Sequence, residues 1–514
     1  MAANTPASLK NPTPCEVIYH VFLRSFYDSN GDQQGDLNGL RRKLDYLQEL
    51  GVTSILLTPL YASAYYHNYF ADDFSKIDPA YGTLQDWVRL VKALHRKGMK
   101  IYMDMEIQYV TGDHPWLKDS YHNPASPYSK YIIYNGPDNT KPEPIIYNIS
   151  TLKGYNGATR EVATVNLYDK DVQEYFYNLF KYWMDPNGDG KFDDGVDGFR
   201  IDHMMDDLDN KGILTDLFGK FWSPLLNRLR EVNPRIKVVA EQANWGSYGT
   251  EYLERGGVDR VFAFHLQQAI ASFNKAEIET AADTTLNMAP EDKQQVVFIE
   301  NHDMQRFSSA VGGNPAKLRV GAALNLLIGG IPSIYYGQEL GMTGAGGFGK
   351  FGNTDGNDIP QREAFEWYKA DTGTGMALWY RNTGPWWDST HDKPDDGISL
   401  EEEKNDPHSL WNFYRTLISI RKAHPVFCGG KYQAIDNNNG EVFSFLRTEA
   451  GKAAVVAINL SDAEQPAVMD FSKDNIPLNG KELLNLYGGI SPEISGQTAS
   501  VNLPPYGIQV WILK

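Results

Sequence analysis

The sequence of 514 residues predicts an α/β fold built on parallel strands, followed by a separate β-domain. Short apolar runs recur over roughly the first 340 residues, and helical patterns lie between most of them. Alternation of strand and helix favours right-handed βαβ units and hence a parallel sheet. After Pro425 the pattern changes to short strands separated by turn signals, which predicts the second domain.

The first strand is expected at Val17–Phe22. The helix after it has apolar residues at positions i, i+4 and i+7, which share one helical face: Leu40, Leu44 and Leu47. Asn38 is a candidate cap for the start of this helix, because its side chain can accept a hydrogen bond from a free backbone N–H. Gly51 is placed where a left-handed residue commonly ends a helix.

Seven further runs have the length and composition of strands: Ser54–Thr58, Lys100–Met105, Val196–Ile201, Lys237–Ala240, Arg260–Phe264, Val296–Ile299 and Pro332–Tyr336. Between the second and third, Thr83 and Asp86 have the spacing of a capping box. Eight such units predict a (β/α)8 TIM barrel, whose chemistry lies at the carboxyl ends of its strands. Four carboxylates fall at or just past such an end: Asp104, Asp202, Glu241 and Asp303.

Two segments depart from a plain barrel. About 90 residues, rich in Tyr, Asn, Pro and Gly, separate the third strand from the fourth, which predicts a loop-built subdomain over the barrel mouth. The C-terminal region has a turn signal at 436–440 and expected strands at Val442–Leu446, Ala453–Asn459 and Ile508–Leu513. We therefore expect a barrel over residues 1–106 and 171–425, an inserted subdomain over 107–170, and a C-terminal antiparallel β-sandwich domain over 426–514.

Composition excludes several classes of partner. Asp and Glu outnumber Lys and Arg by 65 to 48, and this net charge of −17 would repel nucleic acid and anionic membranes. No stretch approaches the roughly 20 apolar residues that a membrane-inserted helix needs. Only two cysteines are present, Cys15 and Cys428, and they lie far apart in the sequence; a disulfide framework is excluded, and nothing resembles a zinc or haem spacing. The first residues lack the features of an export signal, so the protein is either cytoplasmic or has had a signal removed; we favour an extracytoplasmic location, and we expect a monomer.

Three short segments carry residues suited to chemistry. In Gly198–Asp202, Arg200 precedes Asp202 by two residues on one strand, so both point to the same face, and the cation would keep the carboxylate ionised. A barrel-interior ion pair is the alternative. In Val238–Glu241 the terminal Glu is either a general acid or a loop-facing surface residue. In Asn301–Asp303, His and Asp could bind substrate hydroxyls or form a capped turn.

Together these segments resemble the α-amylase superfamily, glycoside hydrolase family 13, whose pattern reads G-x-R-x-D, then a strand-end Glu, then N-H-D. The resemblance extends from about Val17 to the C-terminus and is closest to bacterial α-amylases and oligosaccharide-acting α-glucan hydrolases. Three further segments support it: Arg24–Asp32, Gly330–Glu339 and Asp358–Trp367.

The resemblance implies a retaining hydrolase with Asp202 as nucleophile, Glu241 as acid/base and Asp303 as transition-state stabiliser. Such a mechanism needs one ionised and one protonated carboxyl about 5–5.5 Å apart. Arg200 would hold Asp202 ionised, and an apolar or anionic neighbourhood would keep Glu241 protonated. Arg200 and His302 would both contact the sugar at the −1 site.

The sequence departs from the family pattern after the third strand. The usual D-x-x-x-N-H reads Asp104-Met-Glu-Ile-Gln108-Tyr109 here, so the His that binds the −1 sugar and the Asn that helps to hold calcium are replaced. Asp104 and Tyr109 are candidate substrate contacts, and Gln108 is one methylene too long for the usual calcium ligand. Many relatives carry Lys-His three residues after the nucleophile as +2 contacts, whereas His203-Met-Met-Asp206 stands here; His203 is a candidate contact.

Tyr69 and Phe70 lie where exo-acting relatives carry G-Y-D, whose Asp grips the non-reducing-end glucose. Phe70 cannot do so, while endo-amylases place an aromatic residue there. Tyr69 would be the stacking platform at −1. A core Tyr-Phe pair is the alternative.

One loop alternates oxygen-bearing residues as a calcium-wrapping loop does: Asp28, Asn30, Asp32, Gln34 and Asp36. It resembles the first-loop calcium site of oligosaccharide-acting family members, in which the Gln34 position contributes its backbone carbonyl. We expect a structural calcium ion there. Asp185, Asn187 and Asp189 form either a second such loop or a plain turn.

The preferred function is hydrolysis of α-1,4-linked glucans or malto-oligosaccharides by double displacement in an open cleft, with an α-gluco-oligosaccharide as the only expected partner. An exo-acting α-glucosidase, or a transglycosylase such as a trehalose synthase, is the first alternative, and Phe70 argues against it. A catalytically inactive carbohydrate-binding barrel is the alternative of another class, and the retained carboxylates argue against that.

Overall fold

The computed structural model describes residues 15–388, 394–474, 476–478 and 480–514. It contains a closed barrel of eight parallel strands in the order in which they occur along the chain, with the last strand paired to the first. These strands are β1 (Ile18–Val21), β2 (Ser54–Leu57), β5 (Lys100–Met105), β9 (Gly198–Met204), β10 (Lys237–Gln242), β11 (Arg260–Phe262), β12 (Gln294–Val297) and β13 (Ile331–Tyr335). The predicted barrel is confirmed. Residues 1–14, on which the expectation about an export signal rests, lie outside the described residues.

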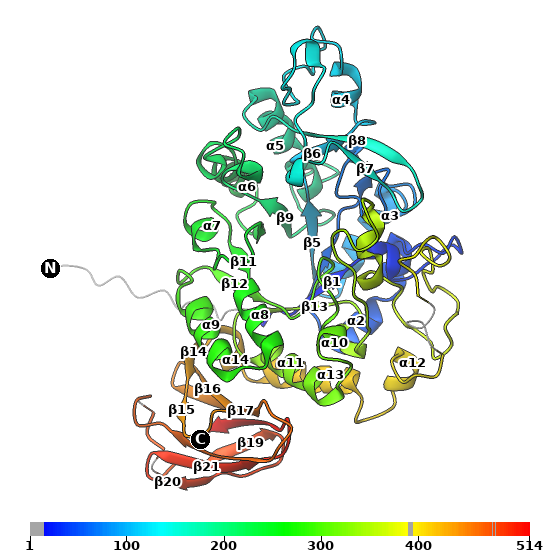
Figure 1. The fold of residues 1–514 in the computed structure, drawn as a ribbon. Helices are drawn as coiled ribbons and strands as arrows, with labels where there is room; N and C mark the ends of the chain where they lie inside the picture. The colour runs from blue at the N-terminus through cyan, green and yellow to red at the C-terminus, as the bar shows by residue number, and fades with distance from the viewer. Residues whose placement is uncertain (1–14, 389–393, 475, 479) are drawn as a thin grey trace, which may run out of the picture.

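Helices lie between the strands and around the barrel (Figure 1). They are α1 (Leu37–Arg42), α2 (Leu44–Leu50), α3 (Leu84–Arg96), α5 (Lys170–Met184), α6 (Ser223–Val232), α7 (Thr250–Glu254), α8 (Phe264–Ser272), α9 (Lys275–Asn287), α10 (Phe307–Ala310), α11 (Pro315–Leu327), α12 (Leu400–Glu403), α13 (Leu410–Ala423) and α14 (Val426–Gly429). Within the described ranges, no helix combines the length and the apolar character needed to cross a bilayer.

Local sequence signals explain most helix ends. Thr83 and Asp86 form the predicted capping box of α3. Gly51 ends α2 with a φ of 100°. The prediction that Asn38 caps the first helix is wrong, because Asp36 accepts the hydrogen bond from the Gly39 backbone N–H and α1 begins one residue before Asn38. Both side chains can cap, and the sequence alone did not decide between them.

The barrel interior is filled by one side chain from most strands. These side chains form a single buried cluster: Ile18, Leu56, Tyr102, Val239, Phe262, Val296 and Ile331. The strand β9 contributes Gly198 beside Tyr102, and a Cβ at Gly198 would lie 2.5 Å from the Tyr102 ring. Glycine is therefore required there by the close approach of the ring. Above this layer, toward the carboxyl ends of the strands, polar side chains replace apolar ones.

Between β5 and α5 the chain forms a small three-stranded antiparallel sheet, of β6 (Tyr109–Thr111), β8 (Thr159–Thr164) and β7 (Thr151–Lys153), together with α4 (Pro115–Ser120). A hairpin of β3 (Tyr61–Ala62) and β4 (Asp73–Ile77) follows β2. Figure 1 shows β6 to β8 at one end of the molecule and the C-terminal strands at the other.

The C-terminal region is a pair of antiparallel sheets, as predicted. One sheet holds β14 (Lys431–Ala434), β16 (Val442–Glu449), β17 (Lys452–Asn459), β22 (Ile508–Leu513) and β19 (Leu483–Tyr487). The other holds β15 (Asp436–Asn437), β18 (Gln465–Asp470), β21 (Thr498–Leu503) and β20 (Glu493–Ser495). Alternate residues of β17 serve two cores: Ala454, Val456 and Ile458 join the barrel-side core, and Ala453, Val455 and Ala457 join the core of the C-terminal region.

Cys15 and Cys428 form a disulfide bond, with their Cα atoms 5.1 Å apart. The two cysteines are 413 positions apart, and the sequence gave no sign that they pair. Cys15 lies three residues before β1, and Cys428 lies in α14 at the junction with the C-terminal sheets. The bond therefore ties the start of the barrel to its end.

Candidate active site

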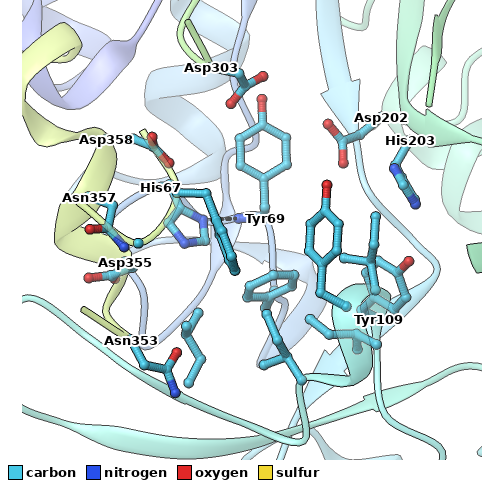
Figure 2. Close-up of a pocket in the computed structure, with 18 of the residues that line it drawn as sticks. His67, Tyr69, Tyr109, Asp202, His203, Asp303, Asn353, Asp355, Asn357 and Asp358 are labelled. Carbon is cyan, nitrogen blue, oxygen red and sulfur yellow. Dashed lines mark hydrogen bonds between the residues drawn. The ribbon is translucent and has the colours of Figure 1, made fainter. Parts of the chain in front are cut away.

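A cleft of about 1130 Å³ opens at the carboxyl ends of the barrel strands. One wall is the segment 145–152 of the inserted region, and another is the loop 348–362 after β13. Figure 2 shows Asp202 and Asp303 at one end of this pocket, with Asn353 and Asp355 farther away. Seven of the ten predicted catalytic and substrate-binding residues line the cleft: Tyr69, Phe70, Tyr109, Asp202, His203, Glu241 and Asp303.

A single buried guanidinium group organises the floor of the cleft. Arg200 Nη1 lies 2.6 Å from Asp104 Oδ2 and 2.5 Å from Asp202 Oδ1, and its Nη2 lies 2.7 Å from Glu241 Oε2. Arg200 and Asp202 share a face of β9, as their spacing predicted. Both interpretations of this segment therefore hold: Arg200 makes buried ion pairs, and Asp202 reaches the cleft.

Backbone irregularities aim the second carboxylate. The pairing of β10 with β9 shifts in register between Ala240 and Gln242, which is where Glu241 stands. Such irregularities commonly re-aim a side chain next to an active site. The backbone N–H of His203, whose φ is 45°, donates to Glu241 Oε2 at 3.1 Å. Glu241 thus accepts from a guanidinium and from a backbone N–H. Of the apolar or anionic neighbourhood that was expected, the anionic one is present, because Asp104 and Asp202 lie on the same guanidinium.

Burial and mutual repulsion act on the carboxyl groups together. Burial raises the pKa of Asp202 well above its usual value; Arg200 acts in the opposite direction, and Glu241 and Asp104 raise it further. Burial likewise raises the pKa of Asp303 to about 7 and that of Asp104 to about 6, against the opposing effects of Arg362 and Arg200 respectively. Four carboxyls thus share two guanidinium groups, which favours retention of a proton within the set.

His302, Tyr69 and Asp104 form a hydrogen-bonded row beside these carboxylates. The Tyr69 hydroxyl donates to Asp104 Oδ2 at 2.7 Å and lies 2.6 Å from His302 Nε2. His302 Nε2 is also 3.0 Å from Asp303 Oδ2, and burial lowers the pKa of His302 well below its usual value. A neutral ring that meets two acceptors through Nε2 carries its proton there. Consistent with this, Nδ1 has no partner among the described residues.

Asp303 is fixed by an arginine that the sequence analysis did not select. Arg362 Nη2 lies 3.0 Å from Asp303 Oδ1, its Nε donates to the His302 carbonyl at 2.8 Å, and its Nη1 donates to the Tyr66 hydroxyl at 2.8 Å. Arg362 belongs to the segment Asp358–Trp367 that supported the family resemblance. The signal was therefore present, but no residue in that segment was singled out.

The remaining predicted contacts fall into two groups. Arg200, His302 and Asp104 are buried behind the lining residues, where they orient the groups that line the cleft. Tyr109 and His203 line the cleft and share a partner, Asp209, whose Oδ1 lies 2.5 Å from the Tyr109 hydroxyl and 3.1 Å from His203 Nε2. Asp209 was not predicted, since nothing in its local sequence distinguishes it.

Tyr69 and Gln108 have defined roles in the packing. The Tyr69 ring lies parallel to the His302 ring at a centroid distance of 5.3 Å, so one of its faces is occupied by protein. Gln108 Nε2 donates to Glu106 Oε1 and to the Asp202 carbonyl, both at 3.2 Å. Gln108 therefore braces the backbone at Asp202, and burial raises the pKa of Glu106 to about 8.

The predicted calcium loop carries oxygen ligands of the kind that calcium prefers, and several of these oxygens accept hydrogen bonds from the backbone of the same loop. Asp28 Oδ1 accepts from Gly31 N at 2.7 Å, Asp32 Oδ1 accepts from Gln34 N at 2.8 Å, and Asp36 Oδ2 accepts from Ser29 N at 2.8 Å. Asn30 Oδ1 accepts from the Asp32 backbone N–H at 3.0 Å. In the described ranges no three Asp, Glu, His or Cys side chains are grouped as metal ligands. A carboxylate has about four lone-pair sites, so these oxygens can still act as calcium ligands while they accept backbone hydrogen bonds. They are not arranged around a common point in this structure.

The second candidate loop resembles a plain turn. Asp189 Oδ2 pairs with Lys191 Nζ at 3.0 Å, and Asp185 Oδ2 accepts from Gly190 N at 2.7 Å. Asn187 Oδ1 accepts from the Asp189 backbone N–H at 2.8 Å. A lysine already neutralises one of the two carboxylates, which disfavours a cation there.

The whole chain is similar to carbohydrate-active enzymes. A family model described as the alpha amylase catalytic domain matches residues 20–430, and one described as the maltogenic amylase C-terminal domain matches residues 432–510. Alpha-amylase 3 of Dictyoglomus thermophilum is 30% identical over 87% of this chain and 85% of its own. Probable oligo-1,6-glucosidase 3 of Bacillus subtilis is 28% identical over 96% of this chain and 98% of its own.

A trehalose synthase/amylase of Mycobacterium tuberculosis is 26% identical over 89% of this chain and 83% of its own. The crystal structure of an alpha-amylase from H. orenii superposes with a TM-score of 0.79 at 27% identity, covering 98% of this chain and all of that one. With the closed barrel and the carboxylates at its mouth, these matches show that the chain is a glycoside hydrolase of the alpha-amylase family, glycoside hydrolase family 13.

Proposed function

We propose that this enzyme hydrolyses α-1,4-linked glucans or malto-oligosaccharides with retention of configuration. Asp202 is the nucleophile, Glu241 the acid/base and Asp303 the stabiliser of the transition state. The observation that carries the proposal is the shared guanidinium: Asp202 Oδ1 and Glu241 Oε2 lie 2.5 and 2.7 Å from two nitrogens of Arg200. That bridging supports the short separation of about 5–5.5 Å of retaining enzymes rather than the 6.5–9.5 Å of inverting ones.

The site residues divide the work of the two steps. Asp202 attacks the anomeric carbon while Glu241 gives its proton to the leaving glycosidic oxygen, which leaves a covalent glycosyl-enzyme. Glu241 then takes a proton from water, which attacks the same carbon and releases Asp202. Arg200 stabilises the carboxylate form of Asp202, and Arg362 orients Asp303 toward the sugar hydroxyls.

An exo-acting α-glucosidase or a trehalose-synthase-like transglycosylase is the second candidate. It draws support from a contact beside the cleft: the Tyr155 backbone N–H donates to Asp355 Oδ1 at 2.5 Å, which ties the inserted region to the loop after β13. Phe70 in the cleft lining argues against it, because an aromatic side chain cannot grip sugar hydroxyls as a carboxylate does. We do not propose an inactive binding barrel, since all three carboxylates line the cleft.

Product stereochemistry tests the double displacement. We expect the α-anomer to form first from maltotriose or maltopentaose, because two inversions at one carbon restore its configuration. Proton NMR within the first minutes of hydrolysis, before mutarotation, measures it directly. An initial β-anomer would contradict both the mechanism and the carboxylate roles.

We also propose that a structural calcium ion binds in the loop Asp28–Asp36. The three aspartates and Asn30 support it, because hard oxygen donors repel one another less when a divalent cation lies among them. A metal that binds only the folded state contributes about 2.7 kcal/mol of stability at a hundredfold excess over its Kd.

Chelation should therefore lower the melting temperature while activity at 25 °C changes little. Asp32→Ala should abolish the response of the melting temperature to calcium, and Asp189→Ala, in the second loop, should not. A wild-type melting curve unmoved by chelator would rule the ion out.

We propose an extracytoplasmic location and a monomeric state. The Cys15–Cys428 disulfide supports the location, because such bonds persist mainly in oxidising compartments. Tyr147 and Phe348 touch each other at the cleft, and the other exposed large apolar side chains of the described ranges come from three different segments, which supports a monomer: Leu84, Ile213 and Met288.

A further inference from the structure

Two of the most exposed aromatic side chains of the described residues touch each other at the cleft. Tyr147 is 71% exposed and Phe348 is 79% exposed. Their ring centroids are 5.2 Å apart with the planes at 40°. Both residues line the same cleft as Asp202, Glu241 and Asp303. The pair is therefore a feature of the active-site mouth.

The two rings come from different walls. Tyr147 lies in a single turn, Ile146–Asn148, of the region inserted after β5. Phe348 lies in the loop after β13. In the barrel, β5 and β13 are separated by β2 and β1, so the loops that follow them rise from different parts of the rim. The ring contact consequently bridges one part of the mouth.

The backbone at Tyr147 is held in a costly conformation. Its φ is 60° and that of Asn148 is 57°, both in the left-handed region. For a bulky residue this costs about 1–2 kcal/mol, and an exposed ring recovers little of it by burial. A strained, exposed aromatic residue at a site mouth indicates a role in function rather than in stability.

The loop that carries Phe348 is rich in glycine. Gly347 and Gly349 flank the residue with φ values of 131° and 78°. A Cβ at either glycine would meet nothing within 4 Å, so close packing does not require glycine there. A pair of aromatic rings adds only about 0.5–1.5 kcal/mol beyond the area it buries. The contact is therefore weak enough for another apolar surface to replace it.

We propose that Tyr147 and Phe348 form a recognition site for one glucosyl unit of an α-gluco-oligosaccharide, bound against the exposed faces of the two rings and outside the catalytic carboxylates. The apolar face of a pyranose ring matches an aromatic ring, and Asn148 and Asn353, which line the same cleft, offer hydrogen bonds to its hydroxyls. The inference rests on the proposed function, since it names how that substrate is held.

Paired substitutions test the site. Tyr147→Asn removes the ring while keeping a residue that tolerates the left-handed backbone, and Phe348→Ala removes the other ring. We expect the double variant to raise KM for maltopentaose about tenfold, with kcat changed less than about twofold. An aryl α-glucoside, too short to reach the rings, should be turned over as by wild type. Tyr147→Phe and Phe348→Tyr each keep an aromatic ring, so they should leave KM for maltopentaose near the wild-type value. Met288→Ala, which removes an exposed apolar side chain outside the cleft, should have no effect.

Each outcome decides between binding and another role. An unchanged KM for maltopentaose in the double variant would overturn the inference, and so would a rise in activity on starch without a rise in that KM, because the rings would then obstruct rather than bind. Equal losses on the aryl glucoside would indicate damage to the catalytic centre and would also count against it. If wild-type enzyme cleaves no α-1,4-linked substrate, the proposed function fails; if it does and the variants match it, only the recognition site fails.

Discussion

Asp202→Asn should lower kcat by about a thousandfold or more on the best substrate, because an amide cannot form the glycosyl-enzyme. Glu241→Gln should cost a similar factor when the leaving group is a sugar, which needs protonation. It should cost much less when the leaving group is a nitrophenolate, which leaves without a proton. Steady-state kinetics on maltopentaose and on a nitrophenyl α-glucoside separate the two roles.

Asp358→Asn is the matched control for these variants. Asp358 lines the same cleft, but its carboxylate lies 3.5 Å from Arg362 and is not among the carboxylates that contact Arg200. We expect it to retain activity within about tenfold. All three variants should melt within about 2 °C of wild type, because the replacements keep the side-chain shape. Near wild-type kcat in Asp202→Asn would remove that residue from the nucleophile role.

Loss of the Cys15–Cys428 bond should have the largest effect on stability. Cross-linking residues separated by 413 positions restricts the unfolded chain strongly, and a loop of that size corresponds to about 6 kcal/mol in the chain-entropy description. Cys15→Ala, Cys428→Ala and the double variant should lower the melting temperature by similar amounts, because either change breaks the same bond. Activity at 25 °C should persist, since the bond lies away from the cleft residues.

Thermal melts of wild type with and without a reducing agent provide the control. Reduced wild type should melt like the double variant, and the double variant should not respond to the reducing agent. A wild-type melting curve that reduction leaves unchanged would show that the bond contributes nothing measurable. Additive losses in the two single variants would instead point to the packing of each side chain.

The strands of the barrel could be predicted because parallel strands are buried on both faces and read as continuous apolar runs. The position of Asp202 and Glu241 at the barrel mouth could be predicted because both residues end such runs. Their strands are longer than expected: β9 extends to Met204 and β10 to Gln242, so both carboxylates lie within strands rather than just beyond them. The two strands pair with each other there, Gln242 with Met204, and no local sequence pattern encodes this pairing.

The supporting residues were harder to predict because they act across long sequence distances. Arg362 reaches Asp303 over 59 positions, and Asp209 reaches Tyr109 over 100. The choice of Asn38 over Asp36 as a helix cap failed for a related reason. Asp36 also accepts from the Ser29 backbone N–H within the preceding loop, and the helical pattern of α1 alone does not reveal that contact.

The disulfide makes the chain from Cys15 to Cys428 a covalent ring that contains all the catalytic residues and the inserted region. A single protease cut in any surface loop of that ring leaves one covalently connected molecule, whose pieces remain on the folded barrel. The C-terminal sheets lie outside the ring, joined by one stretch of backbone after Cys428. A cut there severs the only covalent link to them. Exposure to proteases thus has unequal consequences along the chain: the catalytic part is protected against separation, and the C-terminal part is not.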